Sequence, residues 1–267
     1  MSLCDNWLKK VFSKKEILSR YGADFGTEYC FLGIKFFKKN FDLHSGERQT
    51  GCSLAEIRQD HRNRYQLVVD YVGKSGRKPE KILDCFCGNG YGSFMMGQAF
   101  PETEILGIDG SEGAIEAART CFNCGKNTFR RQCYPFSLGR TFYDVIVCLE
   151  SIEHIRQDEN FLKTLAARLK KDGLFFLSTP NSEVYPLAPT ENRFHFRHYT
   201  RKEVEKLAGK CGLRILECYS QNVYQLDEQK NTIGLLPENE MVLKKDFAGQ
   251  FDIFILAHST AENETSS

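Results

Sequence analysis

Residues 81–93 place an apolar run, an acid and a cluster of glycines within a few positions of one another. The run ends in Asp84, and the glycines that follow it are Gly88, Gly90 and Gly92. A second apolar run, residues 105–108, ends in Asp109. This order is typical of a strand, a glycine turn, a helix and a second strand with an acid at its end. Glycine lets backbone approach a ligand closely and the acid suits ribose hydroxyls, so the pattern predicts a nucleoside-binding site.

Strands and helices alternate from this motif onward. Apolar runs predict strands at 81–85, 104–108, 128–131, 144–149, 174–179, 214–220 and 251–258. Helical spacing predicts helices at 91–99, 113–121, 158–169 and 201–211. Alternation of this kind gives a parallel sheet with right-handed crossovers. The last two strands, joined by a polar insertion, are expected to be antiparallel. We therefore expect a doubly wound α/β fold with a seven-stranded, mostly parallel sheet and a reversed last strand.

The chain is expected to divide into three parts. Residues 1–75, with a helix at about 54–72, are predicted to form an N-terminal helical cap or substrate lid. Residues 76–260 are predicted to form the core, with insertions at 181–200 and 221–249. The small, polar residues 261–267 are expected to be a disordered tail.

Charge and cysteine usage limit the kind of partner and compartment. The net charge of +1 argues against a broad surface for nucleic acid. The eleven cysteines are odd in number and come without a secretory segment, so we expect reduced thiols in a cytoplasmic protein. The spacing of Cys121 and Cys124 leaves zinc as an alternative to plain packing. Since no apolar run reaches the roughly 18 residues that a bilayer requires, no transmembrane segment is expected.

Four segments resemble the class I S-adenosylmethionine-dependent methyltransferases. They are residues 84–90, 107–111, 144–154 and 171–181, and together they span residues 81–181 in the family's order and spacing. The dinucleotide-binding alternative lacks its third glycine, because position 93 is serine. The sheets of dinucleotide-binding proteins are also usually parallel throughout, whereas methyltransferase sheets end in a reversed strand. The resemblance implies S-adenosylmethionine as the cofactor and methyl transfer as the reaction.

Three shorter segments are similar to a bacterial subgroup associated with surface-polysaccharide and sugar modification. They are residues 46–48, 60–65 and 192–200. This resemblance implies a small-molecule or sugar-like acceptor. The oligomeric state is not predicted by any pattern in the sequence.

The family resemblance also implies which residues bind the cofactor. They are Asp84, Cys87, Gly88, Asn89, Gly90, Asp109, Gly110, Cys133, Tyr134, Leu149 and Arg48. Gly88 and Gly90 would admit the methionine end against bare backbone. Asp109 would accept both ribose hydroxyls, with a helix N-cap ahead of Ser111 as its alternative role. Arg48 would pair with the methionine carboxylate, for which a guanidinium is well shaped, and its alternative is a solvated surface position.

The glycine turn and the third strand depart from the family at two positions. Position 86 is phenylalanine where the family usually has glycine or alanine, and a ring turned into the site would crowd the cofactor. Gln132 and Cys133 stand where the family often has an aspartate that meets the adenine amino group. Cys133 or a backbone carbonyl is therefore expected to make that contact.

The catalytic residues are expected after the fourth and fifth strands. Glu150, His154 and His195 are the candidates, with Glu153 and His198 beside them. One interpretation is a general base, in which His154 or His195 takes a proton from a substrate hydroxyl. A second is a divalent metal held by carboxylates and imidazoles, since Glu-x-x-Glu-His also resembles ubiquinone-pathway and small-RNA 2′-O-methyltransferases in which metal binding is implied. The third is an ordinary helix start.

We therefore expect an S-adenosylmethionine-dependent methyltransferase that acts on a small-molecule or sugar-like acceptor, at oxygen, with a histidine base and no metal. Two other functions remain open at this stage. One is a nucleic-acid 2′-O-methyltransferase with a metal-assisted Glu/His site, which the near-neutral charge disfavours. The other is a module that binds S-adenosylmethionine without turnover.

Overall fold

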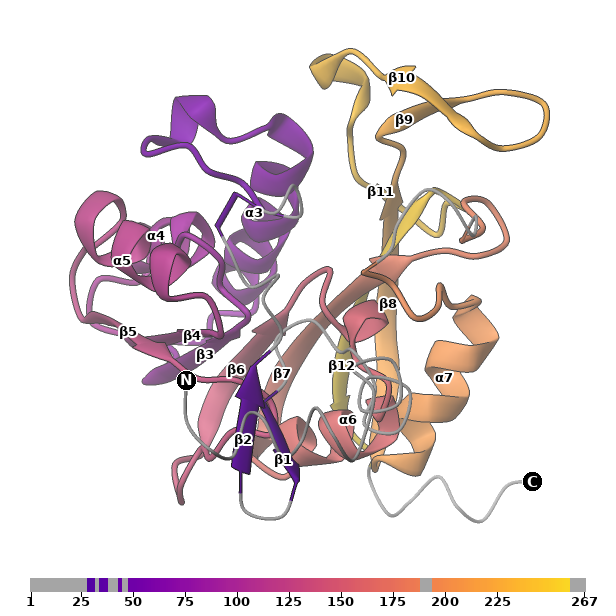
Figure 1. Cartoon of the computed structure of the whole chain (residues 1–267). Coiled ribbons are helices and arrows are strands. Elements are labelled where there is room, and N and C mark those ends of the chain that lie inside the picture. Colours follow the sequence, from indigo (N-terminus) through magenta and orange to yellow (C-terminus); the bar gives the residue numbers. More distant parts are fainter. Residues whose placement is uncertain (1–27, 32–33, 38–42, 45–47, 188–193, 260–267) are drawn as a thin grey trace, which may run out of the picture.

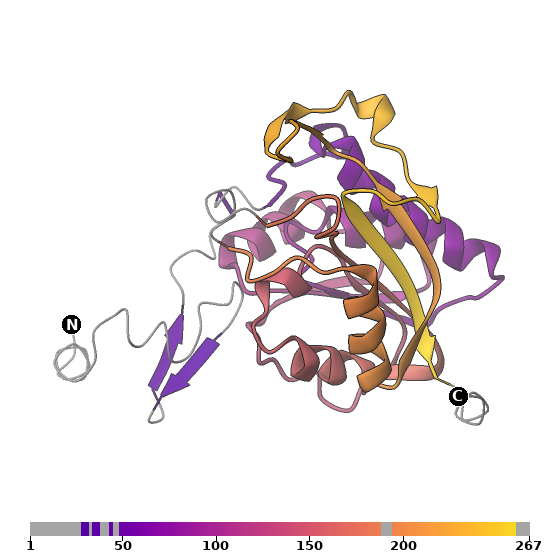
Figure 2. The same ribbon diagram turned by 90° about the vertical axis from the view of Figure 1, so that its right-hand side faces the viewer.

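A large twisted sheet runs through the computed structural model, with helices on both of its faces (Figure 1, Figure 2). The model describes residues 28–31, 34–37, 43–44, 48–187 and 194–259. The first 27 residues of the expected cap and the expected tail lie outside this range. The sheet strands are β3 (Lys81–Cys85), β4 (Glu104–Asp109), β5 (Asn127–Arg131), β6 (Tyr143–Cys148), β7 (Leu169–Pro180), β8 (Leu213–Gln221), β11 (Lys244–Lys245) and β12 (Phe251–His258).

The strand order is β11-β8-β12-β7-β6-β3-β4-β5. Neighbouring strands from β7 to β5 are parallel, whereas β12 is antiparallel to both β7 and β8. The doubly wound fold with a reversed last strand is thus confirmed. The sheet has eight strands instead of seven, because the two-residue strand β11 pairs with the outer side of β8.

Two hydrophobic layers hold the helices on the sheet. On one face lie α3 (Gln59–Lys74), α4 (Tyr91–Ala99) and α5 (Glu112–Cys121), and on the other lie α6 (Asp158–Ala166) and α7 (Arg201–Lys210). Val68 and Val72 of α3 are fully buried on the first face, and Phe161 and Leu165 of α6 on the second. Full burial of one such side chain stabilises a fold by roughly 1.5–3 kcal/mol.

The region expected to be a helical lid is only partly helical, and its helix belongs to the core. A short 3-10 helix, η1 (Leu54–Glu56), precedes α3, and it starts at the N-cap Ser53, where the Glu56 carboxylate accepts hydrogen bonds from the backbone amides of Cys52 and Ser53. Helix α3 begins at Gln59. The same region contains an unpredicted antiparallel hairpin, β1 (Glu28–Phe31) and β2 (Ile34–Phe37).

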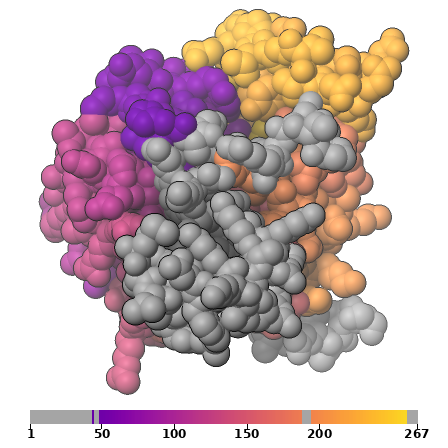
Figure 3. All heavy atoms as spheres, viewed as in Figure 1, coloured from indigo at the N-terminus to yellow at the C-terminus, as the bar shows by residue number. Residues whose placement is uncertain are grey.

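The polar insertion at 221–249 carries a second hairpin, formed by β9 (Tyr224–Leu226) and β10 (Thr232–Leu235), and the 3-10 helix η3 (Glu238–Glu240). It stands above the sheet in Figure 1 and forms the raised upper right of the surface in Figure 3. Across the described ranges, none of the helices combines the length and the apolar character that a bilayer crossing requires.

The cysteines differ from expectation at one pair. Cys52 and Cys121 form a disulfide with a Cα–Cα distance of 5.1 Å, so the expectation of reduced thiols throughout is wrong for this structure. Cys121 is thereby taken out of a zinc pair with Cys124. Seven further cysteines of the described residues are free thiols, and four of them, Cys85, Cys87, Cys133 and Cys148, are buried.

Candidate active site

The three glycines after β3 differ in the space around them. Gly88 borders open space, whereas Gly90 and Gly92 are closely packed. A Cβ on Gly88, whose φ is +57°, would meet no atom within 4 Å, so this position borders open space as a ligand contact requires. A Cβ on Gly90 would lie 2.7 Å from the Cβ of Ala118, and one on Gly92 would lie 2.1 Å from the Tyr65 ring. Of the two glycines expected to admit the cofactor, Gly88 fits that role, whereas Gly90 is glycine because helices α4 and α5 pack there.

Asp84 is completely buried beneath this turn. Its carboxylate accepts hydrogen bonds from the Tyr65 hydroxyl at 2.9 Å and the Ser93 hydroxyl at 2.6 Å. Burial raises the pKa of Asp84 to about 6, although both hydroxyl bonds oppose that shift. Asp84 was expected to bind the cofactor, and in the structure its carboxylate fixes the turn to α3 and α4.

Asp109, at the end of β4, lies against the same turn. Its Oδ2 accepts from the Gly88 amide at 3.1 Å, and its Oδ1 accepts from the Ser111 amide at 2.8 Å. The N-cap of α5 is Ser111, whose hydroxyl accepts from the Ala114 amide. Asp109 is therefore not the helix cap that was its alternative role, and its carboxylate faces the glycine turn.

Arg48 meets a different part of the site from the one expected. Its Nη2 donates to Oδ1 of Asp109 at 2.9 Å, and both side chains are almost fully buried. Arg48 was expected to pair with the methionine carboxylate. In the structure its guanidinium instead pairs with Asp109, the acid that was expected to bind ribose. The chain beside Arg48 is fixed to the glycine turn, since the Asn89 amide donates to the Gly51 carbonyl at 2.7 Å.

The Phe86 ring packs on helix α6 and leaves the turn accessible. Phe86 has a φ of +59°, a backbone conformation that glycine adopts at no steric cost and other residues disfavour. Its ring stacks on Phe161 at 5.8 Å between centroids and meets the edge of Phe136 at 6.0 Å. Phe86 borders the site without closing it, and this departure from the family is compatible with a cofactor.

The residues expected around adenine lie beyond the end of β5. The Cys133 thiol contacts the Gly110 carbonyl at 3.9 Å, so these two predicted cofactor residues lie together. The Tyr134 ring is buried against Phe136 and Phe161. Cys87 packs in a small cluster with Ile115, Ala118 and Phe129 and contributes its backbone to the turn.

Two small adjoining cavities connect these residues to the end of β6. Their volumes are about 60 and 80 Å³, and both are lined by Arg48, Phe86, Gly88 and Glu150. The first also reaches Asp109 and His154, and the second reaches Asn89 and Leu149. Part of the predicted cofactor set thus lines the same small cavities as Glu150 and His154, whereas His195 lines neither.

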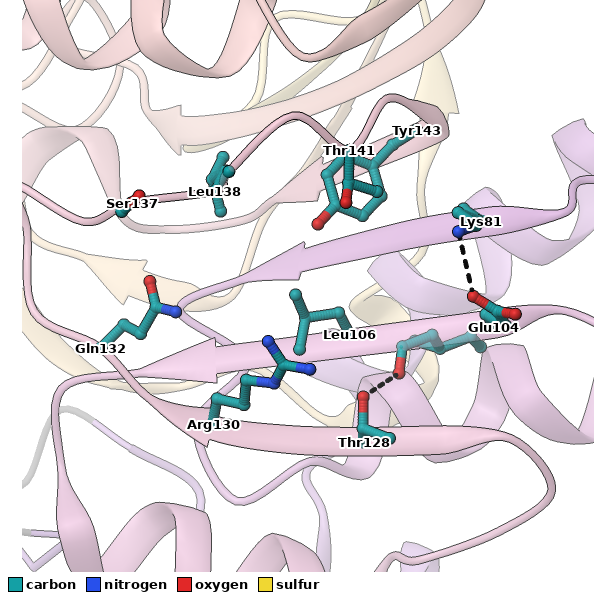
Figure 4. Close-up of a pocket in the computed structure, with 12 residues that line it drawn as sticks. Lys81, Glu104, Leu106, Thr128, Arg130, Gln132, Ser137, Leu138, Thr141 and Tyr143 are labelled. Carbon is teal, nitrogen blue, oxygen red and sulfur yellow. Dashed lines mark hydrogen bonds and ion pairs between the residues drawn. The ribbon is translucent and has the colours of Figure 1, made fainter.

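A larger cavity, about 450 Å³, lies elsewhere (Figure 4). Leu106, Thr128 and Arg130 line it from the sheet, opposite Ser137 and Leu138 of the β5–β6 connection. This connection contains no helix, so the sheet face stays uncovered there. None of the predicted catalytic residues lines this cavity, and we do not assign the active site to it.

Glu150 is held in place directly after β6. Its φ is +47°, its amide donates to the Ser178 hydroxyl at 2.8 Å, and the same hydroxyl donates to its Oε1 at 2.6 Å. Burial raises the pKa of Glu150, and the positive charge of Arg64 opposes that shift. Ser178 of β7 therefore orients this carboxylate toward the cavities.

Glu153, His154 and His195 form a compact cluster beside Glu150. One donor atom from each of the three lies within 4.8 Å of the others. Glu153 is 1% exposed, and the His154 and His195 rings meet edge to face at 4.6 Å. Glu153 and His154 belong to the 3-10 helix η2 (Ile152–His154), so the alternative of an ordinary α-helix start does not describe this buried cluster.

Residues 194–199 bring His195 to this cluster through backbone contacts. The Phe196 amide donates to the Glu153 carbonyl at 2.8 Å, and the Phe194 carbonyl accepts from Nδ1 of His154 at 3.2 Å. The predicted convergence of the segments after the fourth and fifth strands is therefore present.

His198 extends the cluster by one further ring. Its Nε2 lies 2.8 Å from Nδ1 of His195, and its Nδ1 lies 2.7 Å from the Tyr185 carbonyl oxygen. Burial lowers the pKa of His198 to about 4, against the opposing effect of the Tyr185 carbonyl. The ring is therefore neutral near pH 7.

Four residues that contribute to the site were not among the predicted cofactor-binding or catalytic residues. Tyr65 and Ser93 hold Asp84, and Ser178 holds Glu150. Glu153 was considered but not selected. The Glu-x-x-Glu-His spacing pointed to Glu153. The hydroxyl groups of Tyr65, Ser93 and Ser178 act through tertiary contacts, which no motif in the sequence indicates.

The fold and this site define a doubly wound transferase that uses a nucleoside cofactor. A family model described as a methyltransferase domain matches residues 56–218, which is more than half of the chain. The chain belongs to the class I S-adenosylmethionine-dependent methyltransferases.

Individual relatives are more distant. The chain is 32% identical over 122 residues to a ubiquinone biosynthesis O-methyltransferase of Pelagibacter ubique, with 43% of this chain and 49% of the relative covered. It is 25% identical over 158 residues to the enzyme of the same name from Coxiella burnetii, with coverage of 52% and 66%. It thus spans about half to two thirds of the length of these curated relatives.

A solved structure supports the fold. The methyltransferase domain of bacterial CtHen1-C superposes with a TM-score of 0.53 at 20% sequence identity, covering 75% of this chain and 100% of that one. At this identity the likeness concerns the fold alone.

Proposed function

We propose that this chain transfers a methyl group from S-adenosylmethionine to a hydroxyl group of a small molecule. The observation that carries the proposal is one cavity bordered by both halves of the site. Gly88 and Asp109, from the predicted cofactor set, line this cavity together with the predicted catalytic residues Glu150 and His154. In-line transfer requires this proximity, because alignment of donor and acceptor supplies roughly 7–11 kcal/mol of the barrier reduction.

The residues on the cofactor side fit a nucleoside with an amino-acid end. Gly88 presents bare backbone to open space. The buried Oδ1 of Asn89 has no hydrogen-bond partner within the described part of the chain, so it is a suitable acceptor for the cofactor's ammonium group. Asp109 would accept the ribose hydroxyls after Arg48 has moved away from its Oδ1.

The cluster of Glu153, His154 and His195 would activate the acceptor hydroxyl. A single base requires one imidazole, whereas here two imidazoles and a carboxylate turn toward one point. Two imidazole nitrogens and a carboxylate oxygen suit a divalent transition-metal ion better than Mg²⁺, which prefers oxygen ligands, so we favour metal assistance over the lone histidine base expected from the sequence, with Mn²⁺ as the first ion to test. A bound cation would polarise the hydroxyl and lower its pKa.

The acceptor class rests on charge and on the relatives. A net charge of +1 offers no broad surface for nucleic acid. The matching curated relatives are named O-methyltransferases of ubiquinone biosynthesis, which supports oxygen of a small molecule as the target. The sugar-like acceptor is a narrower prediction within this class.

Chelation tests the proposal. Protein treated with EDTA and dialysed should bind S-adenosylmethionine as before but lose methyl transfer, and Mg²⁺ or Mn²⁺ should restore it. Methyl transfer that continues after EDTA treatment would contradict metal assistance and would favour a histidine base. Tight cofactor binding without turnover on any phenol, sugar or RNA would support the binding module, and methylated RNA alone would support the nucleic-acid enzyme.

A further inference from the structure

His198 lies behind His195 and makes its contacts through both ring nitrogens. One nitrogen, Nδ1, lies 2.7 Å from the Tyr185 carbonyl oxygen, and the other, Nε2, lies 2.8 Å from Nδ1 of His195. The ring is 9% exposed. Tyr185 in turn packs against His198 with ring centroids 5.5 Å apart.

This chain of contacts fixes where the protons are. A carbonyl oxygen can only accept, so Nδ1 of His198 carries the proton that it donates to Tyr185. In a neutral ring Nε2 then holds a lone pair and accepts, which requires the proton of His195 to be on its Nδ1. The remaining nitrogen of His195, Nε2, therefore carries the lone pair.

We infer that His198 is a positioning residue that sets the tautomer of His195, so that the Nε2 lone pair of His195 is available to the Glu153–His154 cluster. The inference rests on the proposed function, because it gives His195 its purpose as a ligand or base. His154 is set in the same way by the Phe194 carbonyl, which accepts from its Nδ1 at 3.2 Å. In a neutral His154 ring, Nε2 then carries the lone pair, as it does in His195.

Three variants separate this role from plain packing. Glutamine at position 198 keeps a carbonyl to accept from His195 and an amide to donate to Tyr185, so H198Q should behave as the wild type does. H198F keeps ring volume but has neither group. H258F is the matched control, because His258 also contacts a backbone carbonyl, that of Leu169 at 3.2 Å, far from the cluster.

The tautomer can be read directly by long-range ¹H–¹⁵N correlation on histidine-labelled protein without added metal or cofactor, with His195 assigned by its loss in H195N. We expect the Nδ1–H tautomer of His195 in the wild type, H198Q and H258F, and a population of Nε2–H in H198F. An Nε2–H form in the wild type would overturn the inference, and so would an unchanged tautomer in H198F. The wild-type spectrum decides even if H198F does not fold.

Activity gives the second readout. H198F should lower kcat or the affinity for the activating metal by about 10- to 100-fold, as loss of an orienting partner does, with S-adenosylmethionine binding retained. H198Q should rescue this loss. A loss of equal size in H198Q would contradict the inference. If the spectra agree but no protein transfers methyl groups, the proposed function fails while the tautomer assignment stands.

Discussion

Nη2 of Arg48 and Oδ1 of Asp109 are 2.9 Å apart, in a contact where the two side chains are 8% and 2% exposed. The oxygen that would accept a ribose hydroxyl is therefore also the partner of a guanidinium. If Asp109 binds the ribose as we propose, we expect ribose and Arg48 to compete for this oxygen.

Asp109→Asn should weaken binding of S-adenosylmethionine by about tenfold or more, because a hydrogen bond to a charged group contributes about 1.5–3 kcal/mol. Calorimetric titration measures the affinity. Asp144→Asn is the control, since Asp144 accepts from the amides of Glu80 and Lys81 at the start of β3. Equal affinity in the Asp109 variant would remove this residue from the cofactor site.

Arg48→Ala should tighten binding of the same cofactor by roughly two- to tenfold, since loss of one competing hydrogen bond is worth about 0.5–1.5 kcal/mol. Arg48→Lys, which retains the charge, should lie between the two proteins. Weaker binding in Arg48→Ala would instead favour the contact to the methionine carboxylate that the sequence predicted.

Asp84→Asn should change how stability depends on pH. The pKa of Asp84 is raised from 3.8 to about 6, so the unfolded chain releases this proton at lower pH than the folded protein does. The contribution of Asp84 to stability therefore falls as pH rises from about 4 to about 6, by about 3 kcal/mol in total. Urea unfolding at several pH values should show the variant gaining on the wild type across this window. A constant difference between the two would contradict the raised pKa of the buried Asp84 carboxyl.

Phe86→Ala should cost about 1–3 kcal/mol of unfolding free energy, because the ring loses its contacts with Phe136 and Phe161. Cofactor affinity should change little, as the ring packs away from the turn. Phe142→Ala, at a phenylalanine that is 50% exposed, is the matched control for stability. A large gain in affinity in the Phe86 variant would mean that the ring obstructs the site.

Reduction of Cys52–Cys121 should lower the free energy of unfolding. The bridge joins residues that are 69 positions apart, and closing a loop of that length is worth roughly 4 kcal/mol in the chain-entropy description. Denaturant unfolding with and without reductant measures the difference, and Cys52→Ser should not respond to reductant. Unfolding curves that coincide for the wild type would show that the bridge contributes nothing.

The regular elements were predictable because their signals are local. Helix α4 and strands β3 and β12 have the predicted bounds, and the reversed pairing of β12 follows from the order of apolar runs. Where the prediction failed, tertiary contacts decided. Strand β7 begins at Leu169 instead of 174 because Leu169 pairs with Tyr143 of β6.

The residues of the candidate site also fall into those that a local pattern predicted and those that depend on tertiary contacts. Asp84, Asp109 and the Glu-x-x-Glu-His spacing were recognisable because each lies at the end of an apolar run or soon after it. The contacts of Arg48 with Asp109 and of Ser178 with Glu150 join residues 61 and 28 positions apart, and no period or motif in the chain encodes them. The disulfide joins two cysteines whose separation resembled no known pattern.

Transfer of a trideuterated methyl group from labelled S-adenosylmethionine to small-molecule hydroxyls, followed by mass spectrometry, tests the central claim most directly. With Mg²⁺ or Mn²⁺ present, we expect the wild type to place the label on oxygen of a small molecule. Glu153→Gln and His195→Asn should bind the cofactor but leave the acceptor unlabelled. Label found only on nitrogen or on RNA, or equal labelling by both variants, would contradict the account.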